Sequence, residues 1–190
     1  MICYAASGCF MKLSDEFMDE AGNKKLAIIT DILCVIFTLL VSVTNSDAAC
    51  IFLSILIGTA LASKVDSINH IISAILFIVI LAIAGFPHFS LVCLVVCTIA
   101  AFVDEKGNDY SDKQIENNKG GFITTFFKYR YALKIAVLLF SLIGIVNMYL
   151  PGSMFCNFNF SAITFVDFLL FDLSYEFIGS HFNRINNFLN

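Results

Sequence analysis

The residues best suited to chemistry in this sequence are carboxylates that stand at the ends of apolar runs. Asp104 and Glu105 directly follow one such run, and Asp172 and Glu176 lie one helical turn apart near the end of another. Carboxylate oxygens gathered at one level are the ligands that Mg²⁺ and Ca²⁺ prefer. The sequence therefore predicts a magnesium site with seven candidate ligands: Asp15, Glu16, Asp66, Asp104, Glu105, Asp172 and Glu176.

Two further carboxylates, Asp31 and Asp167, lie within apolar runs. A charge near the centre of a membrane helix costs roughly 2.5–3.5 kcal/mol, so such residues usually face the interior of a bundle and have partners. We interpret both as intramembrane polar residues. A structural alternative applies to all of these carboxylates, because each could pair with a basic side chain: Lys25, Lys64, Lys134 or Arg184.

Composition places these carboxylates in a membrane protein. Of the 190 residues, 59% are hydrophobic and 14% are charged, and the mean hydropathy is +0.87. A soluble domain of this size has too much surface for its volume to hide so many apolar side chains, whereas lipid can cover them. The net charge of −4 lacks the basic excess of a nucleic-acid-binding protein.

Apolar runs of about 17–25 residues can cross a bilayer, and their distribution predicts an all-α, polytopic transmembrane bundle. The predicted long helices number six, at about 26–43, 48–64, 71–86, 88–103, 132–150 and 161–179. Residues 1–13 form a shorter apolar helix that either crosses or inserts partway. The stretch at 104–131, rich in Gly, Asn and charges, is predicted to be a solvated loop with a short helix around residues 110–117.

Alternating these helices across a membrane places every basic residue on one side. One side receives residues 12–25, 64–70, 104–131 and 180–190, and the other receives 44–47, 86–88 and 150–160. All eleven basic residues fall on or at the edge of the first side: Lys12, Lys24, Lys25, Lys64, Lys106, Lys113, Lys119, Lys128, Arg130, Lys134 and Arg184. The positive-inside rule places that side, with the charged loops and the C-terminus, in the cytoplasm of a multi-pass cell-membrane protein.

The chain is predicted to be a single transmembrane domain, 1–190, with two loosely similar halves. Residues 1–67 and 88–176 each contain an apolar run ending in Asp-Glu, a following glycine, a long helix, and then a helix whose inner end is acidic. The two segments begin four crossings apart, so they would point the same way, as in parallel repeats.

Two segments also resemble small uncharacterised polytopic membrane proteins of methanogenic archaea. They are Asp104-Glu105-Lys106-Gly107-Asn108-Asp109 and Phe171-Asp172-Leu173-Ser174-Tyr175-Glu176. The resemblance covers most of the chain and implies no activity. The NDxxDxxxD run of prenyltransferases begins at Asn108 but ends in Glu116 instead of Asp, and no Walker loop, HExxH or GxSxG motif occurs.

Three functions are compatible with this pattern. The first is Mg²⁺-dependent handling of a lipid phosphate at the cytoplasmic edge. It is favoured because the opposite side has almost no ionisable residues. The second is a carrier of cations or small solutes that uses Asp31, Asp167 and Asp172, and the third is a non-enzymatic scaffold. An enzyme site should be a one-sided pocket of acids, whereas a carrier should place polar residues at several depths.

Overall fold

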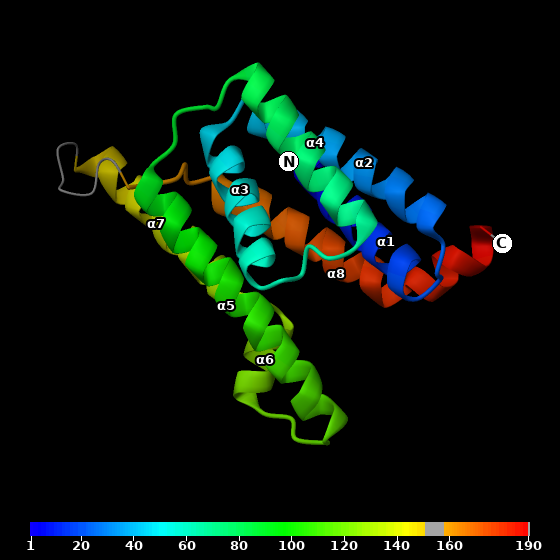
Figure 1. Cartoon of the computed structure of the whole chain (residues 1–190). Coiled ribbons are helices and arrows are strands. Elements are labelled where there is room, and N and C mark those ends of the chain that lie inside the picture. The colour runs from blue at the N-terminus through cyan, green and yellow to red at the C-terminus, as the bar shows by residue number, and fades with distance from the viewer. Residues whose placement is uncertain (151–157, 190) are drawn as a thin grey trace. The chain divides into compact units, whose positions relative to one another are not determined.

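A computed structural model describes residues 1–150 and 158–189, which form eight α-helices and no strand (Figure 1). In chain order the helices are α1 (Ile2–Asp19), α2 (Lys24–Ser42), α3 (Ser46–Leu61), α4 (Ile68–Ala84), α5 (Leu91–Glu116), α6 (Phe122–Lys128), α7 (Tyr131–Tyr149) and α8 (Thr164–Leu189). The all-α prediction is therefore confirmed.

The helices divide into two compact units. Unit 1 comprises Met1–Asn45, Asp66–Pro87 and Val166–Asn190, and so contains α1, α2, α4 and nearly all of α8. Unit 2 comprises Ser46–Val65 and His88–Phe165, with α3, α5, α6 and α7. The predicted repeats do not coincide with these units, because α3 belongs to unit 2 and α8 mainly to unit 1.

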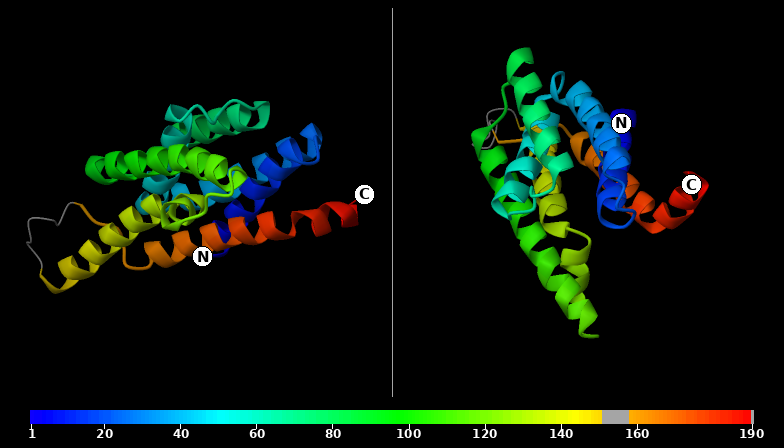
Figure 2. Two further views of the ribbon diagram at one scale, coloured as in Figure 1. Left: turned by 90° about the horizontal axis from the view of Figure 1, so that it is seen from below. Right: turned by 45° about the vertical axis from the view of Figure 1, so that its right-hand side comes forward.

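In unit 1, α1 and α2 form a helical hairpin, and α4 packs against α2 (Figures 1 and 2). The turn of the hairpin needs Gly22, whose φ of +63° is left-handed, and Asn23, whose side chain accepts the N–H of Leu26 to cap α2. α8 lies directly on α1, since a Cβ on Gly8 would come within 2.1 Å of the Phe171 carbonyl oxygen.

In unit 2, the long helix α5 packs against α3, α6 and α7. A Cβ on Gly58 of α3 would lie 2.6 Å from the Ala101 Cβ, so the missing side chain lets α3 and α5 approach closely. At the start of α3, Asp47 accepts the Ser161 N–H and the Thr164 hydroxyl, both at 2.7 Å. These contacts hold the beginning of α8 to unit 2.

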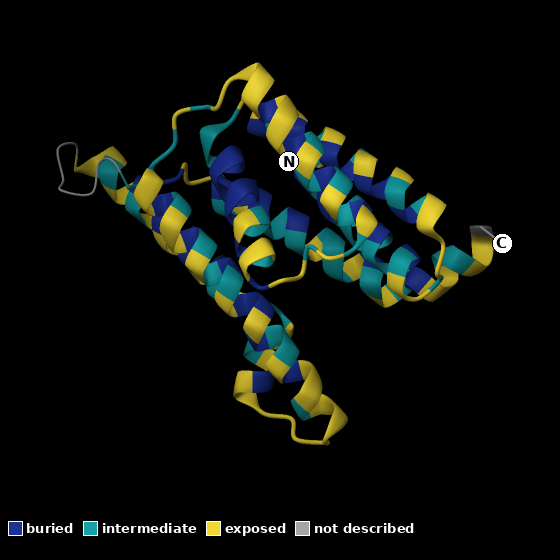
Figure 3. Ribbon diagram, viewed as in Figure 1, coloured by how far each residue is buried: buried dark blue, intermediate teal, exposed yellow. Residues whose placement is uncertain are grey.

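Two of the helices, α2 and α7, are long and apolar enough to cross a bilayer, with mean hydropathies of 2.2 and 2.0 in their most apolar windows. α3 and α4 are also apolar but shorter, with 16 and 17 residues. Of the six predicted spanning helices, the two that correspond to α2 and α7 have the length and hydropathy of a membrane-spanning helix. Many large apolar side chains on all of these helices are exposed (Figure 3).

The stretch at 104–131, predicted as a solvated loop with a short helix around residues 110–117, is helical over more of its length than predicted. α5 continues through Asp104 and Glu105 to Glu116, and α6 folds back beside it. Gly107 leaves the space that the Phe127 ring fills, and the Ser111 hydroxyl donates to the Thr124 carbonyl oxygen at 2.9 Å. These contacts cover one face of the helical stretch.

The predicted ends of the first and last helices are also too early. α1 does not stop near residue 13 but continues to Asp19, and α8 continues to Leu189 instead of ending near 179. The added turns pack on each other, since the rings of Phe17 and Phe182 meet edge to face at 5.2 Å beside the buried Ala27. This small apolar cluster stabilises helix in segments that their charges mark as polar.

Candidate functional site

Unit 1 contains a cluster of ionisable and polar side chains drawn from four helices, which we call the acid–histidine cluster. Its members are Asp15 of α1, Asp31 of α2, Asn69 and His70 of α4, and Tyr175 of α8. Each residue stands on the side of its helix that faces the others, because α1 packs along α2, α4 packs on α2, and α8 packs on α1.

His70 stands between the two carboxylates. Its Nε2 lies 3.4 Å from Asp15 Oδ1, and its Nδ1 lies 3.5 Å from Asp31 Oδ2. The Tyr175 hydroxyl donates to the other oxygen of Asp15 at 2.8 Å. A neutral imidazole has a single N–H, so both ring nitrogens can donate to carboxylates only in the imidazolium form. The arrangement therefore contains an acceptor for a proton on each side of the ring.

Asn69 ties the cluster to the helix backbone. It is fully buried, and its Nδ2 donates to the Ser14 hydroxyl at 2.8 Å, which in turn donates to the Ala27 carbonyl oxygen at 2.9 Å. The Asn69 Oδ1 is buried and accepts no hydrogen bond. A buried oxygen without a donor is costly, so its place in the cluster marks a position for a water molecule or a ligand.

Polar side chains also continue along the buried face of α2. Asp31, Cys34, Thr38 and Ser42 recur every three or four residues and are all buried, Asp31 being only 4% exposed. The Ser42 Oγ has no hydrogen-bond partner, and neither has the Oγ of Ser73, one turn beyond Asn69 on α4. Unit 1 thus contains polar groups at several levels along its helices, in addition to those of the cluster.

The carboxylates of unit 2 are arranged differently. Asp104, 2% exposed, accepts the Ala132 and Leu133 N–H groups at 2.9 and 2.7 Å, and so caps α7. The Oε1 atom of Glu105 lies 3.3 Å from the Nε of Arg130. Arg130 precedes α7 and has a left-handed backbone conformation, with a φ of +50°. Favourable hydrogen bonds at a helix N-terminus stabilise the charged carboxylate. Both side chains therefore have a structural role.

The other predicted ligands are in unit 1. Glu16 pairs with Lys12 at 2.8 Å on the same helix, Asp66 is exposed in the α3–α4 connection, and Asp172 and Glu176 are half-buried on α8. Asp167, predicted as intramembrane, is buried with its Oδ1 3.1 Å from the Met1 ammonium. Of the seven candidate ligands, only Asp15 belongs to the acid–histidine cluster.

These positions bear on the magnesium prediction only in part. Asp104 and Glu105 belong to unit 2 and the other five candidates to unit 1. Across residues 1–150 and 158–189, no three His, Cys, Asp or Glu side chains are placed to share a metal. In the cluster itself the His70 ring separates Asp15 from Asp31, where a shared cation would otherwise stand. The magnesium site stays a prediction.

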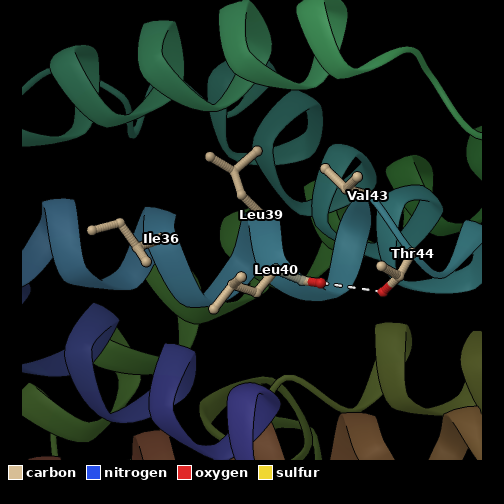
Figure 4. Close-up of a pocket in the computed structure, with 5 residues that line it drawn as sticks. All are labelled: Ile36, Leu39, Leu40, Val43 and Thr44. Carbon is tan, nitrogen blue, oxygen red and sulfur yellow. Dashed lines mark hydrogen bonds between the residues drawn. The ribbon is translucent and has the colours of Figure 1, made fainter.

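A shallow hollow of about 320 Å³ lies on the C-terminal half of α2. Figure 4 shows its lining, which consists of Ile36, Leu39, Leu40, Val43 and Thr44, with the Thr44 hydroxyl turned to the Leu40 carbonyl oxygen at 3.2 Å. No titratable side chain lines it, so the hollow offers an apolar contact surface and no site for proton transfer or charge recognition.

Sequence reasoning found the two aspartates of the cluster but missed its centre. The three histidines are dispersed in the sequence, and none has a second histidine at metal-ligand spacing. The available signal was the pair Asn69-His70 at the start of an apolar helix, on the side that carries all of the basic residues. Tyr175 was not predicted to have a role; it appears above only within the segment from Phe171 to Glu176.

Comparisons with protein-family models, with curated proteins and with solved structures find no match for this chain. Its function is therefore argued from the contacts of its own side chains.

Proposed function

We propose that the chain is a multi-pass membrane protein in which α2, α3, α4, α7, the apolar part of α5 and most of α8 cross the bilayer. The lengths and hydropathies of α2 and α7 support this directly. Further support comes from exposed large apolar side chains on these helices, such as Ile75 and Ile83 of α4 and Leu139 of α7. Many exposed apolar side chains on apolar helices fit contact with lipid.

Contacts within each unit agree with the predicted sidedness. In unit 1, Asp15 and His70, both assigned to the basic side, contact each other. In unit 2, Lys64 pairs with Asp109, and the Lys106 ammonium donates to the Ala62 carbonyl oxygen at 2.8 Å. Since positions assigned to one side contact each other, these pairs support the alternation from which we infer a cytoplasmic basic side.

We infer that unit 1 carries protons, alone or coupled to a small solute, through the acid–histidine cluster. The observation that carries this proposal is the depth of the polar residues, which extend from Asp15 and His70 to Asp31 and on to Thr38 and Ser42. Ionisable residues inside membrane helices usually face partners and form proton relays or ion pathways. Only the carrier hypothesis requires polar groups at several depths.

The proton step uses both nitrogens of His70. The imidazolium releases the proton on Nδ1 to the Asp31 carboxylate, which becomes a carboxylic acid, and the ring becomes neutral. The neutral ring keeps its proton on Nε2, so a ring rotation or tautomeric exchange must first free Nε2. Nε2 then takes a proton from the side of Asp15, which restores the imidazolium. Tyr175 holds the second Asp15 oxygen, so the carboxylate keeps its orientation towards the ring.

Proton flux into vesicles tests this function. The protein is reconstituted into liposomes that contain a pH-sensitive dye, and a potassium diffusion potential is applied. We expect acidification above the rate of protein-free vesicles, its loss in Asp31→Asn and His70→Gln, and an unchanged rate in Glu116→Gln, an exposed carboxylate of unit 2. Equal rates for wild type and Asp31→Asn would contradict the proposal.

Handling of a lipid phosphate with Mg²⁺ is a second hypothesis, which the contacts of Asp104 and Glu105 do not favour. Both oxygens of Asp104 already accept backbone N–H groups, and Glu105 already faces Arg130. The remaining acidic pair is Asp172 and Glu176 on α8. Mg²⁺-dependent binding of a polyprenyl phosphate that is lost in Asp172→Asn would restore this hypothesis in place of the carrier.

A further inference from the structure

The end of unit 2 that carries α6 exposes a group of large apolar side chains, which we call the α6 surface. It consists of Ile115 at the end of α5, Phe122 and Ile123 on α6, and Tyr131 at the start of α7. Phe122 is 84% exposed and Ile123 is 58% exposed. Figure 3 shows this end of α5 and α6 as largely exposed. Such side chains at the tip of a polar hairpin require a contact outside the unit.

Exposed charges lie close in sequence to the α6 surface. Lys113 is in the last turn of α5 between the exposed Asp112 and Glu116. Lys119 lies in the α5–α6 connection, and Lys128 ends α6 with its ammonium 5.5 Å from the centre of the Tyr129 ring. Apolar and aromatic side chains bordered by lysines are the composition of segments that lie in the interface of an anionic bilayer. A partner with a negatively charged surface and an apolar layer beneath it fits this pattern.

The position of α7 fixes the level of the α6 surface. Tyr131 and Tyr149 stand at the two ends of α7 and are both exposed, and at 1.5 Å per residue they lie about 27 Å apart along the helix. That separation is close to the ~30 Å thickness of the hydrocarbon core, and tyrosine is enriched at both of its boundaries. α6 ends three residues before Tyr131, so it cannot be far from that boundary.

We propose that α6 and the adjoining end of α5 lie in the headgroup region of the bilayer, with Phe122 and Ile123 inserted among the upper acyl chains and the three lysines at anionic phosphates. This inference rests on the proposed crossing of the membrane by α7. It adds an interfacial lipid-binding surface to unit 2, separate from the acid–histidine cluster. The proposed occupant is lipid; a protein partner at this surface is an outcome of the test.

The chain contains no tryptophan, so single tryptophans can report depth. Phe122→Trp, Leu40→Trp on an exposed position of α2, and Glu20→Trp at the exposed end of α1 are each reconstituted into phosphatidylcholine vesicles with and without phosphatidylglycerol. Quenching is measured with lipids brominated either near the headgroup or near the middle of the acyl chain, and with an aqueous quencher. We expect shallow bromines to quench Phe122→Trp, deep bromines to quench Leu40→Trp, and the aqueous agent to quench Glu20→Trp.

The outcomes separate this inference from the membrane proposal. Water-like emission of Phe122→Trp beside deep quenching of Leu40→Trp would overturn the α6 surface as a lipid site, leave the spanning helices in place, and direct the search to a protein partner. Absence of quenching at both positions would contradict the membrane proposal itself. Phosphatidylglycerol is expected to increase the quenching of Phe122→Trp by shallow bromines. Replacing Lys113, Lys119 and Lys128 by Gln should remove this increase, and an unchanged increase would overturn the role given to the lysines.

Discussion

The two units hold similar acidic pairs in opposite ways. Asp15-Glu16 near the end of α1 and Asp104-Glu105 in the middle of α5 both stand on a helix that packs against the next long helix of its unit. In unit 2, Asp104 accepts two backbone N–H groups of α7. In unit 1, α2 is capped by its own Asn23, which leaves Asp15 to contact His70 and Tyr175. α7 has no side-chain cap from its own N-cap residue and is capped by Asp104, whereas α2 is capped by Asn23 and Asp15 contacts side chains of other helices.

The largest expected effect is the loss of stability when the cap that Asp104 provides to α7 is removed. Asp104→Ala leaves two buried N–H groups at the start of α7 without acceptors, and we expect a loss of about 3 kcal/mol in the free energy of unfolding. Asp15→Ala loses its contacts to the His70 and Tyr175 side chains, and we expect a loss of about 1 kcal/mol. Denaturation in detergent micelles measures both. Equal losses for the two variants would contradict the comparison.

Alanine substitutions at Gly8 in unit 1 and Gly107 in unit 2 test how tightly the helices of each unit are packed. In Gly8→Ala the new Cβ meets the Phe171 backbone at 2.1 Å, whereas in Gly107→Ala it meets the Phe127 ring at 2.0 Å. A ring can rotate away and a helix backbone cannot, so we expect about 2 kcal/mol for Gly8→Ala and about 1 kcal/mol for Gly107→Ala. Thermal unfolding of the two variants provides the measurement, and the reverse order would show that α8 moves more easily than the ring.

Removing the Tyr175 hydroxyl tests whether the contacts of Asp15 matter for proton flux. Tyr175→Phe deletes the hydrogen bond to Asp15 and keeps the ring, so we expect a loss of about 1 kcal/mol in stability. If Tyr175 orients Asp15 towards His70, proton flux also falls, although the variant folds. A matched control is Tyr129→Phe in unit 2, for which we expect full flux. Unchanged flux in Tyr175→Phe would leave the hydroxyl with a structural role alone.

The smallest effect concerns the pair formed by Lys64 and Asp109. The hydrogen bond to Asp109 raises the pKa of Lys64 above its ordinary value. A raised pKa means that the pair stabilises the fold below the pKa of the unfolded lysine and that this stabilisation is lost as the pH rises through the folded value. Because the lysine is 41% exposed, solvent screens the pair, and we expect Lys64→Met to cost at most about 0.5 kcal/mol at neutral pH. Unfolding at neutral and at alkaline pH measures the difference, which should vanish at the higher pH.

The sequence by itself determined the helical class and most of the breaks between helices. The predicted end of the helix at 71–86 lies close to the end of α4 at Ala84, because Gly85 adopts a φ of +91° and Pro87 cannot continue the helix. Asn45 and Asp47 mark the boundary between α2 and α3. Apolar periodicity and backbone chemistry act over a few residues, and both can therefore be read locally.

Only the tertiary structure decided the length of α5 and the composition of the acid–histidine cluster. α5 continues past Asp104 because Phe127 fills the space at Gly107, a contact between residues 20 positions apart. His70 joins Asp15 and Asp31 because α4 packs on α2, a pairing that no local pattern encodes. A carboxylate in the sequence shows where a charge is, but its neighbours in space determine whether that charge caps a helix or accepts a proton.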